Sequence, residues 1–152
     1  MQGHCLCGEV AFEFDGPMTS IELCHCSRCQ RATGSAFDAG FYVRTDRFHW
    51  LRGEHLISFY DAPILRKPPA YRHSFCRKCG SPLPTVYKSQ PHIQIPTGLV
   101  QETLPSTASD HIFTAMKASW WNAEVANLPA HPGAPPAEFR ARMLSALSKP
   151  GE

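Results

Sequence analysis

Alternating apolar and polar residues recur in short segments of the chain and predict β-strands. In GEVAFEF (8–14), Val10, Phe12 and Phe14 share one face and polar or small residues the other, which is typical of a half-buried strand. PLPTVY (82–87) is a further candidate, and its two prolines place it at a sheet edge or make it irregular. The other expected strands are MTSIEL (18–23), FDAGFYV (37–43), LISFYD (56–61), YRHSF (71–75), HIQIPTGLV (92–100) and HIFTAM (111–116).

Turn residues separate these segments. Gly16-Pro17 and Arg52-Gly53 predict turns, and APILRKPPA (62–70), with three prolines, predicts a loop. SRCQRAT (27–33) predicts one or two helical turns, ended by Gly34. Short strands at close spacing with turns between them indicate a single, mainly-β domain.

The C-terminal tail has helical periodicity. In EFRARMLSALSK (138–149), apolar residues recur at the spacing of one helix face, namely Phe139, Met143, Leu144 and Leu147. We expect a short helix that packs this face on the body of the protein. A partner-binding role for the same face is the alternative.

Composition and charge restrict the class of protein. The 152 residues suffice for one core, and the apolar (43%) and charged (18%) fractions fit a soluble globular protein. The 14 prolines disfavour long helices. The net charge is +2 without a long basic run, so nucleic acid is not an expected partner.

The expected location is the cytoplasm. The N-terminal sequence MQGHCLCGEV lacks a basic region followed by an apolar one, and no apolar run reaches the roughly 20 residues of a membrane helix. Thiols stay reduced in the cytoplasm. The seven cysteines therefore indicate metal or redox chemistry rather than a disulfide framework.

The cysteines form three clusters, and two of them match. Cys5-Leu-Cys7 and Cys76-Arg-Lys-Cys79 are each followed at once by glycine, which can adopt the positive φ that a chain wrapping around a metal often needs. Together, these four thiolates would close a tetrahedral zinc site of the structural type. The alternative is two buried pairs of free thiols.

The middle cluster, CHCSRC (24–29), holds Cys24, Cys26 and Cys29 and is followed by Gln30. Three protein ligands and an exchangeable fourth position are typical of catalytic zinc. One alternative is a structural zinc completed by a distant histidine, since coordination by His25 between two ligands is awkward. A redox pair with a spare thiol is another. Nearby Arg28 and Arg31 would soften the negative charge of the thiolates.

An open thiolate–zinc position favours a soft incoming ligand such as a thiol, which ionises on the metal. The resulting thiolate is a nucleophile for a small electrophile such as an aldehyde. The sequence therefore allows addition of a thiol to an aldehyde, or the reverse cleavage of a carbon–sulfur bond. It does not indicate which group moves the proton.

Several motifs resemble the glutathione-dependent formaldehyde-activating enzyme family (GFA), whose domain also occurs in centromere protein V. The matching stretches are GHCLCGEV (3–10), CHCSRCQRATGSAF (24–37), FCRKCGSPL (75–83), IPTGLV (95–100), and HIFTAMKASWW (111–121) followed by Leu128-Pro129. The resemblance implies a GFA-type zinc-binding domain at 3–130 and a C-terminal extension at 131–152.

The resemblance also implies a mainly-β, Mss4-like fold of short antiparallel sheets clipped by a structural zinc. It implies structural zinc at Cys5, Cys7, Cys76 and Cys79, and a labile catalytic zinc at Cys24, Cys26 and Cys29. The implied activity is that of a carbon–sulfur lyase, condensing glutathione as co-substrate with formaldehyde to S-hydroxymethylglutathione.

Other residues near these motifs have two interpretations each. Arg31 either binds an anionic substrate or offsets the thiolate charge, and Trp120 and Trp121 either line a pocket or belong to the core. Two other classes of protein also remain. One is a non-catalytic, zinc-stabilised binding module, and the other is a redox protein similar to methionine sulfoxide reductases, which needs a free catalytic cysteine outside the metal clusters.

Overall fold

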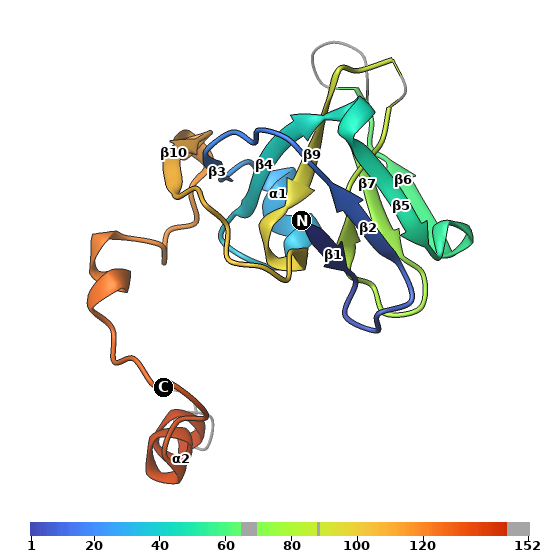
Figure 1. Cartoon of the computed structure of the whole chain (residues 1–152). Helices are drawn as coiled ribbons and strands as arrows, with labels where there is room; N and C mark the ends of the chain where they lie inside the picture. Colours follow the sequence, from blue (N-terminus) through green and yellow to red (C-terminus); the bar gives the residue numbers. More distant parts are fainter. Residues whose placement is uncertain (65–69, 88, 146–152) are drawn as a thin grey trace. The chain divides into compact units, whose positions relative to one another are not determined.

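Short β-strands make up most of the regular structure (Figure 1). The computed structural model describes residues 1–64, 70–87 and 89–145. The strands of this part are β1 (Gln2–His4), β2 (Ala11–Phe14), β3 (Ile21–Cys24), β4 (Asp38–Arg44), β5 (Phe48–Arg52), β6 (Ile57–Asp61), β7 (Arg72–Cys76), β8 (Pro82–Leu83), β9 (His92–Pro96) and β10 (Ala108–Ile112), and the α-helices are α1 (Ser27–Thr33) and α2 (Ala137–Ser145). In this part, no helix has both the length and the apolar character needed to cross a bilayer.

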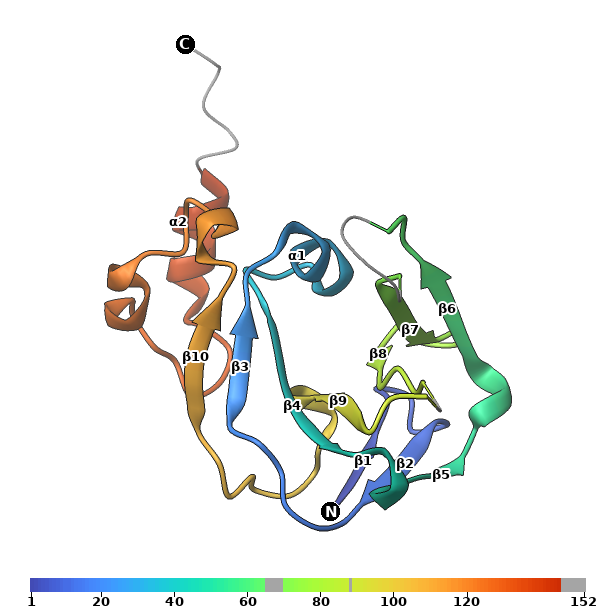
Figure 2. The same ribbon diagram turned by 90° about the horizontal axis from the view of Figure 1, so that it is seen from above.

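The strands form three small sheets. The first has the order β1-β2-β5, the second β10-β3-β4-β9 and the third β6-β7-β8 (Figure 2). The expectation of a mainly-β fold built from short antiparallel sheets is confirmed. One pair departs from it, because β10 runs parallel to β3.

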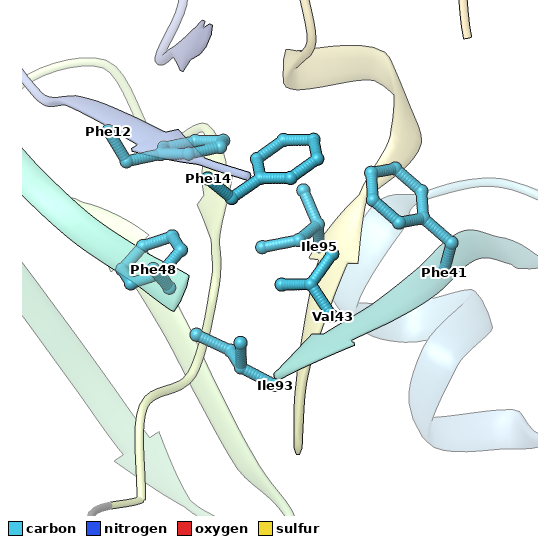
Figure 3. Packing of buried hydrophobic residues seen from close by; sticks show 7 residues of the cluster. All are labelled: Phe12, Phe14, Phe41, Val43, Phe48, Ile93 and Ile95. Carbon is cyan, nitrogen blue, oxygen red and sulfur yellow. The ribbon is translucent and has the colours of Figure 1, made fainter. Parts of the chain in front are cut away.

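The main hydrophobic core lies between the first and second sheets. Phe12 of β2 packs 5.4 Å from Phe48 of β5, and Phe14 packs 5.5 Å from Phe41 of β4, measured between ring centroids. Each buried ring contributes about 1.5–3 kcal/mol. The core comprises Phe12, Phe14, Phe41, Val43, Phe48, Ile93 and Ile95 (Figure 3).

This core fixes which way the second sheet faces. Phe41 and Val43 enter the core from β4, so the alternate residues Asp38 and Tyr42 project from the opposite face. In the same way, Ile93 and Ile95 of β9 point into the core, so residues 92, 94 and 96 lie on the opposite face. One face of the sheet is therefore apolar and buried, and the other carries polar side chains.

Most of the predicted strands are confirmed with shifted ends. In 8–14, Val10, Phe12 and Phe14 are buried as expected, but β2 begins only at Ala11, because the N–H of Val10 donates to Cys5 Sγ rather than to a backbone carbonyl. The proline-rich 82–87 contributes only the two residues of β8, at the edge of the third sheet, as its prolines predicted.

Four details of the strand prediction are wrong. The segment 92–100 leaves β9 after Pro96, and Thr97–Leu99 form a 3-10 helix. Residues 18–20 precede β3 rather than belonging to it. The segment 111–116 leaves β10 after Ile112, because Phe113 adopts φ 57° and starts a 3-10 turn. The short strands β1 and β5 were not predicted. The helix predicted at 27–33 is confirmed and ends at Gly34.

The chain divides into two compact units, Met1–Ser119 and Trp120–Glu152. The second unit contains a 3-10 helix (Ala123–Asn127) and α2, which confirms the short C-terminal helix. Residues 146–149 of the predicted helix lie outside the described residues. Trp120 is 62% exposed, so it is not a core residue.

Candidate metal centres and adjoining cavities

The two matched cysteine pairs meet in space. Cys5 and Cys7 follow β1, Cys76 ends β7 and Cys79 lies in the turn before β8. Their four sulfur atoms all lie within 4.8 Å of one another. The pairs are therefore brought together by the tips of two hairpins, β1–β2 and β7–β8.

Both hairpin tips are built in the same way. The N–H of Gly8 donates to the carbonyl of Cys5 (2.9 Å), and the N–H of Gly80 donates to the carbonyl of Cys76 (2.7 Å). The φ angles of these glycines are 76° and 74°, in the left-handed region that favours glycine. The positive φ that the sequence predicted after each pair is thus present.

Hydrogen bonds secure the tips to each other and to the thiols. The N–H of Leu6 donates to Ser81 Oγ across the two hairpins (2.9 Å), and the N–H of Val10 donates to Cys5 Sγ (3.3 Å). The hydrogen bond with Ser81 lowers the pKa of Cys79 to about 5. The contact with Ser81 favours the thiolate form of Cys79, which is the form that a metal ion requires.

The four-cysteine cluster can hold a metal ion, and its donor set fits zinc. Tetrahedral zinc with Zn–S bonds of about 2.3 Å places its sulfur ligands roughly 3.8 Å apart. The separation between Cys5 Sγ and Cys7 Sγ is 3.5 Å, and between Cys7 Sγ and Cys76 Sγ it is 3.9 Å. All seven cysteines of the chain are free rather than paired in disulfides.

The middle cluster forms where β3 passes into α1. Cys24 ends β3, and Cys26 is the N-cap of α1, its sulfur accepting the N–H of Cys29 at 3.4 Å. Cys29 Sγ lies 3.4 Å from Cys24 Sγ, which is also close to the spacing around zinc. Their hydrogen bond lowers the pKa of Cys24 to about 6 and raises that of Cys29.

Three cysteines make up this second cluster. Within the described residues, no histidine, aspartate or glutamate has a ligand atom grouped with the sulfurs of Cys24, Cys26 and Cys29. Cys26 is partly exposed, whereas Cys24 and Cys29 are buried. The cluster can therefore hold a metal with three protein ligands, and its most accessible member is Cys26.

His25 points away from the cluster. Its Nε2 lies 2.8 Å from Nδ1 of His111, and its ring is fully buried. Burial lowers the pKa of His25, with a further contribution from His111. The backbone of Ala36 acts in the opposite direction and raises the pKa of His25. Among the described residues, no group forms a hydrogen bond of standard geometry with His25 Nδ1. His25 thus contacts His111 of β10 and does not supply a ligand to the cluster.

Gln30, which replaces glycine after the middle cluster, has a structural role that the sequence did not reveal. Its side-chain amide donates to the carbonyl of His25 (2.6 Å) and to that of Met116 (2.8 Å). The backbone N–H of His25 also donates to Ile112. These bonds fasten the segment after β10 to the cysteine loop.

Two cavities are lined in part by residues close in sequence to the middle cluster, although none of its three cysteines is among the lining residues. The first, of about 240 Å³, lies between the polar face of the second sheet and the third sheet, and Asp38, Tyr71 and His73 belong to its wall. The second, of about 520 Å³, is lined by Ser27, Arg28, Arg31, Ala32, Tyr60, Ala62, Pro63, Tyr71 and His73. Tyr71 and His73 therefore border both cavities.

Tyr71 connects the cavities with the cluster. Burial raises its pKa, and the charge of Cys29 adds to the shift. The guanidinium of Arg28 lies 5.8 Å from the Tyr71 ring centroid and donates to the carbonyl of Pro63. Arg28 is thus held in the wall of the larger cavity, and the exposed Arg31 lines the same cavity.

Comparison with known proteins shows the family of the chain. Residues 1–116 match the family described as glutathione-dependent formaldehyde-activating enzyme (GFA). The chain belongs to the GFA family. The crystal structure of a Rhodobacter sphaeroides protein is similar, with 20% sequence identity, a TM-score of 0.52, and coverage of 72% of this chain and 100% of that one. This likeness shows the fold. No curated protein matches the chain.

The family match spans both cysteine clusters and all the lining residues of the two cavities. Three residues of that wall, Asp38, Tyr71 and His73, were not singled out from the sequence. A signal was present in YRHSF (71–75), whose alternation places Tyr71 and His73 on the same face of the chain. No pattern in the sequence indicated that Asp38, on another sheet, would share a cavity with them.

Proposed function

We propose that this GFA-family protein is a zinc-dependent carbon–sulfur lyase, or thiol-adduct enzyme, that carries out a reaction like the condensation of glutathione with formaldehyde. The proposal assigns a structural zinc to Cys5, Cys7, Cys76 and Cys79, and a catalytic, more labile zinc to Cys24, Cys26 and Cys29. The observation that carries it is the second cluster of three grouped sulfurs, together with a cavity lined by Ser27 and Arg28 of the same cysteine loop.

Zinc held by three thiolates would retain a fourth position, at which a substrate thiol can ionise and become nucleophilic. The protein contributes the arrangement around that position. Cys26, at the start of α1, is the accessible member of the cluster, and Cys24 and Cys29 are buried beneath it. The adjoining cavities offer room for the rest of the thiol and for the aldehyde.

The larger cavity suits a thiol that carries negative charge. Arg28 and Arg31 line it, together with the aromatic side chains of Tyr60 and Tyr71. The guanidinium groups would attract carboxylates such as those of glutathione. Arg31, which is exposed, is the better candidate for this contact, because Arg28 is already bonded to Pro63.

Metal analysis of two cysteine variants tests the assignment of the zinc sites. We expect the wild-type protein to bind about two zinc ions per chain. Cys26→Ser should lose one zinc and keep its circular dichroism spectrum, whereas Cys76→Ser should unfold, because binding of a structural zinc contributes to folding. If Cys26→Ser melts as early as Cys76→Ser, the middle cluster is structural and the protein is a binding module.

Exchange NMR of glutathione and formaldehyde tests the activity. The wild-type protein should speed their interconversion with S-hydroxymethylglutathione above the uncatalysed rate, and Cys26→Ser, at equal concentration, should not. An unchanged rate with zinc-loaded wild-type protein would contradict the proposed reaction for this pair of substrates.

A further inference from the structure

The middle cysteine loop is held at His25, the residue between Cys24 and Cys26. The ring of His25 is fully buried, and its Nε2 lies 2.8 Å from Nδ1 of His111 on β10. The backbone N–H of His25 donates to the carbonyl of Ile112 (2.9 Å), at the end of the same strand. His25 therefore attaches the cysteine loop to β10 through both its ring and its backbone.

Gln30 adds a second connection, from helix α1. Its side-chain nitrogen donates to the carbonyl of His25 (2.6 Å) and to the carbonyl of Met116 (2.8 Å). A side-chain amide has two N–H donors, and here they reach two segments that lie far apart in the chain. Gln30 thus joins α1, the cysteine loop and the segment after β10.

The segment that Gln30 holds begins with a residue in an unfavourable conformation. Phe113 has φ 57° and ψ 37°, in the left-handed region that large side chains rarely adopt. There the chain leaves β10 and enters the 3-10 helix Thr114–Met116, whose last carbonyl accepts the hydrogen bond from Gln30. A conformation of this kind persists where surrounding contacts fix it, and such residues cluster at functional sites. The bond from Gln30 is one of the contacts that hold this segment.

We propose that Gln30 is a positioning residue that determines how tightly the middle cluster holds zinc; the inference rests on the proposed function. Two peptide units join Cys24 to Cys26, and each is planar. The N–H of the first unit donates to Ile112, and the carbonyl of the second accepts from Gln30. Both peptide planes between these two cysteines are therefore fixed by hydrogen bonds with residues outside the loop.

Fixed peptide planes matter most for Cys26. Cys24 ends β3 and Cys29 belongs to α1, whereas Cys26 lies between these elements and is partly exposed. Groups that orient metal ligands in this way typically contribute about 10–100-fold to metal affinity. The two carbonyls that Gln30 contacts lie outside the hairpin tips of the four-cysteine cluster, so the effect should be confined to the middle site.

The test compares Gln30→Met with Gln101→Met in the full-length protein. Methionine keeps the approximate shape of glutamine but has no N–H donor. Gln101 is exposed and lies outside both clusters and both cavities. Competition with a chelating dye should show that Gln30→Met raises the zinc Kd of the middle site about 10–100-fold and retains zinc at the four-cysteine cluster. Gln101→Met should keep the wild-type Kd.

Thermal melts in two backgrounds separate this role from a purely structural one. Zinc that binds only the folded state raises Tm, so weaker binding at a fixed concentration of free zinc lowers it. Gln30→Met should therefore lower the Tm of the wild-type protein by more than it lowers the Tm of Cys26→Ser, which is expected to lack the middle zinc. Equal losses of Tm in the two backgrounds, with an unchanged zinc Kd, would show that Gln30 supports only the fold.

Gln30→Asn keeps the amide but is one carbon shorter, and it is the milder variant if Gln30→Met does not fold. The zinc Kd of its middle site should also rise. A Kd within about threefold of the wild-type value, in Gln30→Met or in Gln30→Asn when only the latter folds, would overturn the inference. If the wild-type protein itself binds one zinc ion per chain rather than two, the proposed zinc at the middle cluster is wrong and this inference falls with it.

Discussion

Asp38 is a partly buried carboxylic acid on β4. Burial raises its pKa, and the positive charge of His73 only partly opposes this. A carboxylate that is partly removed from water costs stability, and groups with perturbed pKa values cluster at functional sites. At the scale of single residues, Asp38 is thus better explained by chemistry than by stability.

We expect Asp38→Asn to be more stable than the wild-type protein above the ordinary carboxyl pKa. Because the folded pKa is raised, the folded state binds more protons than the unfolded one as the pH passes between the two values, and stability falls as the pH rises. Asparagine has no such charge. Thermal melts of zinc-loaded protein should show a gain in Tm at about pH 8 that shrinks as the pH is lowered.

Asp46 provides the control for this measurement. It is exposed, and two hydrogen bonds from Arg44 lower its pKa, so its carboxylate is favourable in the folded state. Asp46→Asn should therefore leave Tm unchanged or slightly lower at about pH 8. A drop in Tm for Asp38→Asn at that pH would contradict the argument from burial.

At the scale of elements, the turn between β5 and the following 3-10 helix (Glu54–Leu56) is tightly constrained. Gly53 there has φ 75°, and a Cβ atom at this position would lie 2.1 Å from the carbonyl oxygen of Glu9. Glu9 belongs to the loop that carries the first cysteine pair. The turn and the metal-binding tip of the β1–β2 hairpin thus fit together only with glycine at 53.

Gly53→Ala should be destabilising by roughly 2 kcal/mol or more, because it adds a backbone clash to the cost of positive φ. Gly16→Ala is the matched variant. Gly16 has φ 83°, and a Cβ atom added there would lie 4.0 Å from the nearest atom, Arg47 Cγ, so it would not clash. We expect it to lose about 1 kcal/mol. Urea unfolding of both variants measures the difference in the free energy of unfolding. Equal losses of stability in the two variants would show that the backbone shifts to avoid the clash with Glu9.

Element by element, the sequence predicted strands well where one face is buried. The alternation in 8–14 and 37–43 follows from packing on the core, so it is visible without the fold. It did not predict β1 and β5, whose partner β2 lies between them in the first sheet. Nor did it predict the end of β10 at Phe113, which depends on a single left-handed residue.

At the scale of the whole molecule, the two cysteine clusters differ in how they connect the chain. The four-cysteine cluster joins residues about 70 positions apart and lies beside the second core of Val10 and Leu83. The three-cysteine cluster lies within six consecutive residues. Loss of a metal from the first should release two hairpins, whereas loss from the second should affect only the start of α1.

Titration of the zinc-loaded protein with a chelator should therefore proceed in two steps. The first zinc should leave with little change in circular dichroism, and the second should leave together with the β signal, since it closes the longer loop. Zinc release is followed with a colorimetric dye in parallel with the spectrum. Cys26→Ser should show only the second step, and simultaneous loss of both zinc ions and the fold would contradict the partition.

The sequence by itself determined the local features of this protein. The spacing of each cysteine pair, the glycine after it and the strand alternation are properties of consecutive residues, so they can be read before any folding. The tertiary structure decided which residues share a site. Asp38 and His73 are 35 positions apart on different sheets, and only the packing of these sheets brings them into the wall of one cavity.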